Sequence, residues 1–160
     1  MSLAPDILVT SRDGTSRSLV VEVKLSTHDL QTSEQQLKVH MVRYGCPTGM
    51  LVTPDAVRIY RDTFTSYEEG SVELVGAFSM ASVFEADVAS TIRATEEPTM
   101  RAFQLEDAVQ RWLEGLTNPS NLAALAPDLR EAVEDHVVPA LEQGEVRAAG
   151  PRAGLKRTGT

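Results

Sequence analysis

The chain has 160 residues, of which 42% are hydrophobic and 24% are charged, as in an ordinary globular protein. This amounts to about one domain and excludes a disordered or collagen-like chain. No stretch approaches the roughly 18 consecutive apolar residues of a membrane-spanning helix. Cys46 is the only cysteine, which excludes internal disulfides and multi-cysteine zinc sites. The first residues lack the basic and apolar regions of a signal peptide, so we expect a cytoplasmic protein.

The formal net charge of −8 is unevenly distributed along the chain. Residues 1–67 carry seven basic and seven acidic side chains, residues 68–144 carry four and fifteen, and residues 145–160 carry four and one. An acidic protein binds nucleic acid poorly on electrostatic grounds, but the balanced first segment escapes this objection. We interpret the acidic middle segment as solvated helical surface.

The first part of the chain predicts a hairpin, a helix and two more strands. Asp13-Gly14-Thr15 has the residues of a tight turn between two apolar runs. Apolar residues at spacings of seven, four and three predict a helix that Gly45 and Pro47 end. The predicted elements are strands over residues 7–12 and 18–25, a helix over residues 29–44, and strands over residues 49–53 and 57–64.

Helices dominate the rest of the predicted structure. The pattern predicts a strand over residues 72–78, helices over residues 80–92, 103–116 and 129–141, and a short Ala/Leu-rich segment over residues 119–126. Pro139 is expected to kink or end the last helix. From Gly144 onward large apolar residues are almost absent, which predicts disorder. We therefore divide the chain into an α/β core (residues 1–98), a helical extension packing on it (residues 99–143) and a disordered basic tail (residues 144–160).

The predicted hairpin brings three charged side chains together. Glu22 and Lys24 are two residues apart on one strand, so their side chains leave the same face. If the hairpin folds about Gly14, the numbers of opposed residues sum to 28, and Asp6 lies opposite Glu22. The same register makes the other face apolar, and a slip of one residue would expose that face. The apolar pairs are Ile7 with Val21 and Val9 with Leu19.

Two neighbouring carboxylates and a lysine suit metal-assisted hydrolysis. At neutral pH such carboxylates must share a proton or hold a cation. Hard oxygen ligands with room for water favour Mg²⁺ or Mn²⁺. A nearby ammonium group can position an attacking water or offset the charge that develops on a phosphoryl group. Asp6, Glu22 and Lys24 are therefore the candidate catalytic residues for hydrolysis of a phosphodiester.

The pattern Pro5-Asp6, followed on the next strand by Glu22-Val23-Lys24, resembles the signature of the PD-(D/E)xK nuclease superfamily, with its restriction-endonuclease-like fold. The resemblance covers residues 5–62. Gln36 and His40 match positions where RecB-like nucleases and the nuclease domains of type I restriction enzymes carry Gln and then Tyr, so His40 departs from the pattern. The resemblance implies that Asp6, Glu22 and the Val23 backbone carbonyl bind the metal and that Lys24 orients the nucleophilic water. It makes Gln36 and His40 the substrate-binding candidates.

The resemblance implies a Mg²⁺- or Mn²⁺-dependent DNA nuclease with an α/β fold, in which helices flank a mixed sheet and a helical extension follows. The family fold normally has a helix and a strand before the Asp-bearing strand, and that helix often supplies another acidic residue. Only five residues precede Asp6. The missing layer is expected from a partner subunit, from a larger polypeptide or from the C-terminal helices. An uncovered sheet edge invites pairing, so a homodimer is one expectation.

Two alternatives stay open. The domain is a catalytically inactive relative of these nucleases that binds nucleic acid or protein, or it is an acidic protein-interaction module whose working surface is residues 68–144. Gln36, His40 and Arg43 form one polar stripe on the predicted helix. This stripe either faces the site or is a solvated flank.

Overall fold

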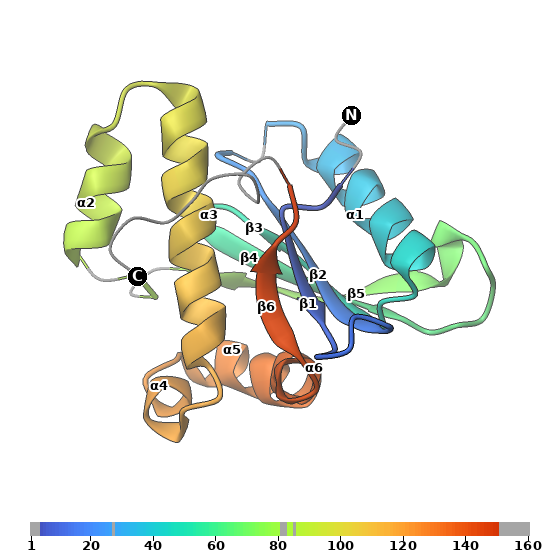
Figure 1. Cartoon of the computed structure of the whole chain (residues 1–160). Helices are drawn as coiled ribbons and strands as arrows, with labels where there is room; N and C mark the ends of the chain where they lie inside the picture. The colour runs from blue at the N-terminus through green and yellow to red at the C-terminus, as the bar shows by residue number, and fades with distance from the viewer. Residues whose placement is uncertain (1–3, 27, 81–82, 85, 151–160) are drawn as a thin grey trace.

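The computed structural model describes residues 4–26, 28–80, 83–84 and 86–150, without the side chains of Ala86 and Asp87. Its strands form one mixed sheet in the order β5-β4-β3-β2-β1-β6, with helices on both faces (Figure 1). In chain order the strands are β1 (Ile7–Thr10), β2 (Arg17–Val23), β3 (Thr48–Val52), β4 (Ala56–Asp62), β5 (Val72–Ser79) and β6 (Glu145–Ala148). The α/β class with a mixed sheet flanked by helices, which the sequence predicts, is confirmed.

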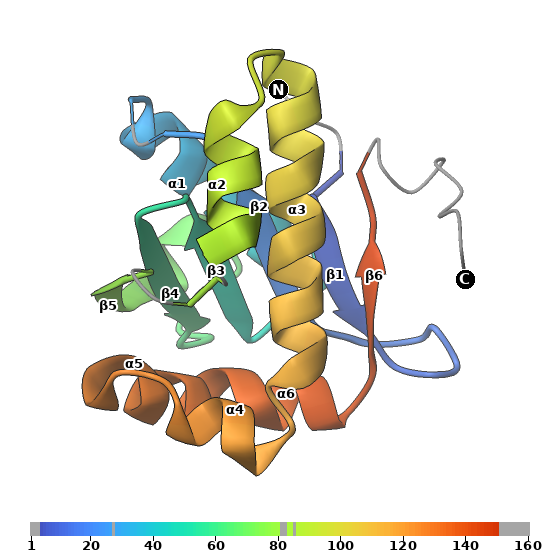
Figure 2. The same cartoon turned by 90° about the vertical axis from the view of Figure 1, so that its left-hand side faces the viewer.

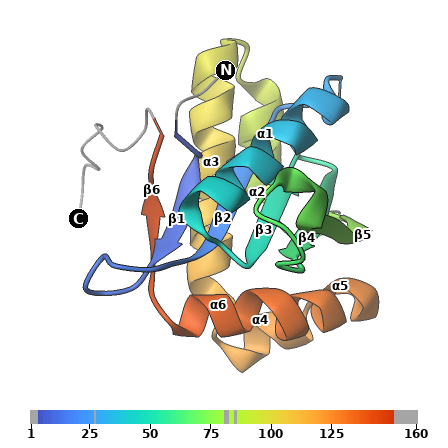
Figure 3. The same ribbon diagram turned by 90° about the vertical axis from the view of Figure 1, so that its right-hand side faces the viewer.

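The helices are grouped by the side of the sheet that they cover. The α-helices are α1 (Leu30–Tyr44), α2 (Ala86–Ala94), α3 (Pro98–Gly115), α4 (Pro119–Ala123), α5 (Pro127–Ala132) and α6 (Val138–Glu142), with a 3₁₀ turn η1 (Glu69–Ser71) and a π-helical turn η2 (Val133–Val137). Figure 2 shows α2 and α3 in front of one face of the sheet, and Figure 3 shows α1 in front of the other. The segment from α4 to α6 runs across one end of the sheet.

The register of the β1–β2 hairpin is the predicted one. The antiparallel pairs include Ile7 with Val21 and Val9 with Leu19, and a bulge shifts the register only beyond Val9. The turn places Gly14 at φ 77°, a conformation that glycine adopts without steric cost. The hairpin thus directs one apolar face into the core, and it directs Glu22 to the opposite side of the sheet.

A helical crossover joins β2 to β3 and makes these two strands parallel neighbours. Helix α1 ends at Gly45, which has the left-handed conformation with φ 66° and donates to the last free carbonyls of the helix. Because a helix that joins parallel strands must run back along the sheet, the first turns of α1 lie near the end of β2. The sheet-facing side of α1 lies near Glu22, which His40 contacts.

Two apolar cores lie on the two faces of the sheet. The larger one packs apolar side chains of β1–β4 against α3, α5, α6 and Ile92 of α2. The smaller one packs the opposite face of β1–β4 against α1. The face under α1 also contains the buried polar side chains of Glu22, Gln36 and His40, and helix α3 on the other face carries the buried polar side chains of Glu106 and Gln110.

Pro139 does not end the last helical segment. The proline lacks an N–H, and its ring would meet the carbonyl of Asp135 in a regular α-helix. The π-helical turn η2 widens the helix just before Pro139, with Val138 N–H bonded to the Val133 carbonyl. Two carbonyls of this segment accept side-chain hydroxyls from the sheet, His136 O from Thr48 Oγ1 at 3.2 Å and Ala140 O from Ser18 Oγ at 2.9 Å.

The predicted disorder from residue 144 onward is wrong for Glu145–Ala148. These residues form β6, which pairs antiparallel with the outer edge of β1, from Thr10 opposite Glu145 to Ile7 opposite Ala148. The apolar residues of β6 are only half-buried. An edge strand of this kind is held mainly by its backbone hydrogen bonds to the neighbouring strand. Residues 151–160 of the predicted tail lie outside the described residues.

Strand β6 covers the outer edge of β1, and helix α3 packs beside it. Helix α3 contacts both β2 and β6. The C-terminal part of the chain, rather than a second subunit, thus covers this edge of β1. Strand β6 is itself an outer strand of the sheet, so the homodimer stays a prediction.

Candidate functional site

Asp6 lies immediately before β1, at the end of the sheet where β2 finishes. Its side chain is 8% exposed, and its Oδ2 accepts a hydrogen bond from the Val23 backbone N–H at 2.7 Å. The β1–β2 register, continued by one residue, places Asp6 opposite Glu22. Val23 N–H therefore ties the Asp6 carboxylate to the Glu22-Val23-Lys24 segment. The orientation of the Val23 carbonyl toward a metal stays a prediction.

Glu22 has no exposed surface. Lys24 lies two residues further along the chain, and its side chain leaves on the same side as that of Glu22. Lys24 Nζ lies 3.8 Å from Glu22 Oε2, and the lysine side chain is 32% exposed. No hydrogen bond to Glu22 Oε2 is present among the described residues. Asp6, Glu22 and Lys24 are thus brought together, with the ammonium group on the solvent side of a buried carboxylate.

The environment strongly disfavours the charged form of Glu22. Burial is the largest cause and the charge of Asp6 the next, and together they raise the pKa of Glu22 from 4.5 to about 8. Lys24 opposes this shift, and the charge of Glu106 adds to it. The carboxylate therefore lacks enough positive charge nearby, and it holds a proton at neutral pH unless a cation compensates it.

Two of the three residues in the predicted polar stripe of helix α1 are buried on the side of this carboxylate. Gln36 and His40 are 6% and 2% exposed, and His40 Nδ1 lies 2.6 Å from Glu22 Oε1. Gln36 Nε2 has no hydrogen-bond partner among the described residues. Arg43, the third member of the stripe, is exposed. The stripe thus faces the site over its first part and solvent at its end.

Glu106 of α3 is a third acidic residue of this region that the sequence interpretation missed. It is 6% exposed, and its charge acts on Glu22. A signal was present, because Glu106 precedes Val109 by three residues and Leu113 by seven, and so lies on the apolar side of the helix. A charged residue on a buried helical face is uncommon unless it has a polar environment.

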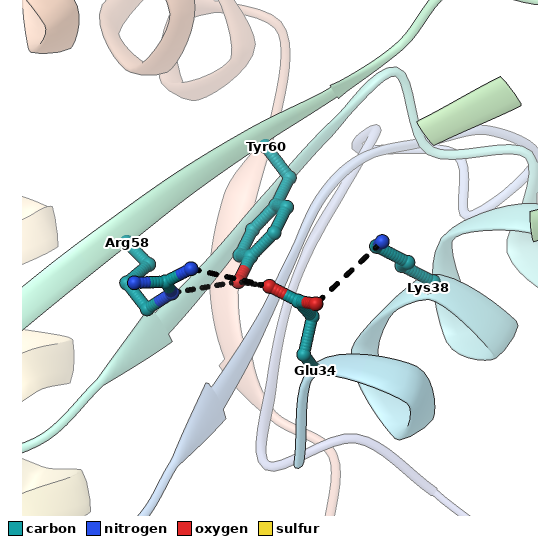
Figure 4. A network of polar contacts seen from close by, with 4 residues as sticks. All are labelled: Glu34, Lys38, Arg58 and Tyr60. Atoms are coloured by element: carbon teal, nitrogen blue, oxygen red, sulfur yellow. Dashed lines mark hydrogen bonds and ion pairs between the residues drawn. The ribbon is translucent and has the colours of Figure 1, made fainter. Parts of the chain in front are cut away.

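A second polar network, on the same side of the sheet as Glu22, links α1 to β4 (Figure 4). Tyr60 Oη donates to Glu34 Oε2 at 2.5 Å and accepts from Arg58 Nε at 2.9 Å. Arg58 Nη2 lies 3.3 Å from Glu34 Oε2, and Lys38 Nζ lies 3.7 Å from Glu34 Oε1. The strand register places Leu51 between Glu22 and Arg58, so the network is two strands away from Glu22. It holds the first half of α1, which carries Gln36, against the sheet.

The described residues contain no group of three or more His, Cys, Asp or Glu side chains arranged to hold a metal ion. Two cavities of the described part, of about 550 Å³ and about 280 Å³, lie elsewhere. One is bordered by α2, α3 and α4, the other by η2 and the start of β3, and Asp6, Glu22 and Lys24 line neither. The cluster is thus a compact polar group rather than the wall of a large pocket.

Comparisons with known proteins yield no match to a family model, to a curated protein or to a solved structure. Among the helices of the described residues, none has the length and apolar character needed to cross a membrane. The Asp6–Glu22–Lys24 cluster is therefore the feature of the molecule that bears on its function.

Proposed function

We propose that this chain is a nuclease-like domain that hydrolyses DNA phosphodiesters with Mg²⁺ or Mn²⁺ at Asp6, Glu22 and Lys24. The observation that carries the proposal is the contact of Lys24 Nζ with the buried Glu22 carboxylate beside Asp6. Two carboxylates and a lysine, at the spacing that the resemblance to PD-(D/E)xK nucleases requires, meet at one end of the sheet.

The donor set fits a hard divalent cation. Glu22 Oε2 is buried without a hydrogen-bond partner among the described residues, and the pKa of Glu22 is raised for want of positive charge. Carboxylate oxygens of Asp6 and Glu22 are the ligand type that Mg²⁺ and Mn²⁺ prefer. When bound, the ion supplies Lewis-acid polarisation of a phosphoryl oxygen and a lowered pKa of water.

The remaining groups of the site have separate tasks in this proposal. Lys24, half in solvent, orients the attacking water and offsets charge that develops on the phosphoryl group. His40 is a positioning residue, because its ring holds Glu22 Oε1 and thereby fixes the direction of Oε2. Gln36, whose buried amide nitrogen has no hydrogen-bond partner among the described residues, stays a candidate for substrate binding.

Replacing Lys24 tests the proposal. We expect K24A to reduce cleavage of supercoiled plasmid and of a single-stranded oligonucleotide by about 10²-fold or more, with Mg²⁺ and with Mn²⁺. The matched control is K38A, because Lys38 is also a half-buried lysine paired with a glutamate, but on the network toward β4. Circular dichroism checks that both variants fold. Equal cleavage rates for K24A and the unmodified protein would remove Lys24 from the mechanism.

A catalytically inactive, nucleic-acid-binding or protein-binding domain is the second candidate. The observation that favours it is the 2.6 Å contact between His40 Nδ1 and Glu22 Oε1, which already occupies one carboxylate oxygen at a position where related nucleases carry Tyr. Calorimetry with Mn²⁺ separates the two candidates. The nuclease predicts heat of binding that D6A abolishes, whereas the inactive domain predicts no heat with either protein.

A further inference from the structure

The loop between β4 and β5 exposes two aromatic side chains. Phe64 is 62% exposed and Tyr67 is 98% exposed. Leu74 and Met100 are also exposed, but each lies on a regular element, β5 or α3. Burial of an aromatic side chain removes about 150–250 Å² of surface from water. Two exposed aromatic rings on one loop therefore forgo most of the hydrophobic stabilisation that their burial would give.

This loop is firmly held at its base. Asp62 Oδ1 accepts from Phe64 N–H at 2.8 Å and from Ser71 Oγ at 2.6 Å. Thr63 N–H donates to the Ser71 carbonyl at 2.9 Å, which closes the loop. Phe64 has φ 58°, a left-handed conformation that costs free energy for a bulky residue and that glycine adopts freely. Strain and exposure at the same residue favour a role in binding outside its own chain.

A cavity of about 550 Å³ lies between α2, α3 and α4. Phe84, Val88 and Trp112 are among its lining residues, so its wall is largely apolar. Cavities of this size hold drug-sized molecules, which leaves room for two aromatic side chains. The cavity lies on the α3 side of the sheet, whereas the loop leads into η1, which contacts α1 on the other side (Figures 2 and 3). The loop of one molecule therefore cannot enter the cavity of the same molecule.

The charges beside the loop and beside the cavity are complementary. Glu68 follows Tyr67 directly and is exposed. Arg111 lines the cavity and is 70% exposed, and its Nη2 pairs with Asp107 at 2.9 Å. A guanidinium group has five N–H donors, so Arg111 can bind a second carboxylate while it keeps this pair. A negatively charged loop with aromatic residues thus matches an apolar cavity that has a cation at its edge.

We propose that copies of this chain associate head to tail, with Phe64 and Tyr67 of one molecule seated in the cavity between α2, α3 and α4 of the next. Because the contact joins two different surfaces, it repeats from molecule to molecule unless a ring closes. The association is independent of the nuclease proposal. Asp6, Glu22 and Lys24 belong to neither surface.

Sedimentation velocity of the full chain, from micromolar to submillimolar concentration, tests this association. The loop variant F64G/Y67S removes both aromatic rings, and glycine relieves the left-handed strain. The cavity variant A124W places a bulky ring at an exposed position of the cavity wall. The control M100Q/L74T removes two exposed apolar side chains from other elements. Circular dichroism checks that every variant folds.

We expect the weight-average mass of the unmodified protein and of the control to rise with concentration. The loop variant and the cavity variant each stay monomeric. An equimolar mixture of these two variants forms a one-to-one complex, because the cavity of the first accepts the loop of the second. A second readout needs no substitution: Trp112 is the one tryptophan of the chain, so its emission shifts to shorter wavelength as the cavity fills.

Four results would each overturn the proposal. The first is an unmodified protein that is monomeric throughout, with unchanged Trp112 emission. The second is association that the loop or the cavity variant retains in full. The third is an equal loss of association in the control, which would indicate unspecific apolar contact. The fourth is a mixture of loop and cavity variants without a complex, which would indicate that the two surfaces do not bind each other.

Discussion

Glu22 is the residue at which the sequence pattern, the fold and the proposed chemistry meet. It is a charged side chain with no exposed surface, and it follows the apolar run Leu19–Val21 of β2. Its neighbours are a second carboxylate, a lysine and a histidine ring, and its pKa is raised to about 8. A group in this state costs stability when it ionises, and such costs are commonly retained at functional sites.

The raised pKa of Glu22 predicts a pH-dependent stability. Between pH 4.5 and about 8 the unfolded chain has lost the Glu22 proton while the folded protein keeps it, so stability falls as pH rises through this window. E22Q removes this penalty. We expect the free energy of unfolding of E22Q, relative to the unmodified protein, to rise by at least about 1 kcal/mol from pH 5 to pH 8. Urea titrations without divalent cations measure it.

The control for this prediction is E34Q. Glu34 is half-buried, and although burial opposes the shift, the hydrogen bond from Tyr60 and the charge of Lys38 lower its pKa. The ionised Glu34 side chain therefore contributes its full stabilisation at any pH above the ordinary pKa of 4.5. This contribution to the free energy of unfolding does not change between pH 5 and 8. Parallel pH profiles for E22Q and the unmodified protein would contradict the assignment of a raised pKa to Glu22.

Among the elements, α1 matters most for the geometry of the site. It contributes Gln36 and His40 from its buried face, while Glu34 and Lys38 on its flank tie it to β4 through Tyr60 and Arg58. A helix held only by apolar contacts can shift by fractions of a turn, whereas the Glu34–Tyr60 hydrogen bond fixes its rotation about its own axis. The network of Figure 4 therefore supports the His40–Glu22 contact from outside the site.

The junction between α6 and β6 gives a prediction at the scale of elements. A Cβ at Gly144 would lie 2.2 Å from the Thr10 carbonyl oxygen, so G144A forces β6 away from β1. We expect G144A to lower the free energy of unfolding by about 1–3 kcal/mol, the usual cost of overpacking. G70A is the control, because nothing lies within 4 Å of a Cβ there. Thermal unfolding of both variants measures the difference, and equal melting temperatures would show that β6 is not held in this position.

The whole molecule is organised so that distant parts of the chain meet at one end of the sheet. Asp6 comes from the first described residues, Glu22 and Lys24 from β2, Glu106 from α3, and Gly150 from the end of the described part. The acidic middle segment forms the helices that cover the large core and one end of the sheet, while the balanced first segment forms most of the sheet (Figure 2). This separation leaves the Asp6–Glu22–Lys24 cluster at the junction between the balanced and the acidic parts.

The hairpin and its charged cluster were determined by the sequence itself. A turn at Gly14 and alternation of Val and charged residues leave one register with a continuous apolar face, and that register brings Asp6 to Glu22. The α/β class followed from the same local patterns. Long-range contacts were decided only by the tertiary structure, because short-range periodicity carries no information about which distant segment pairs with an exposed edge. The pairing of β6 with β1, the burial of Glu106, the turn of His40 toward Glu22 and the return of Gly150 to Asp6 all belong to this second group.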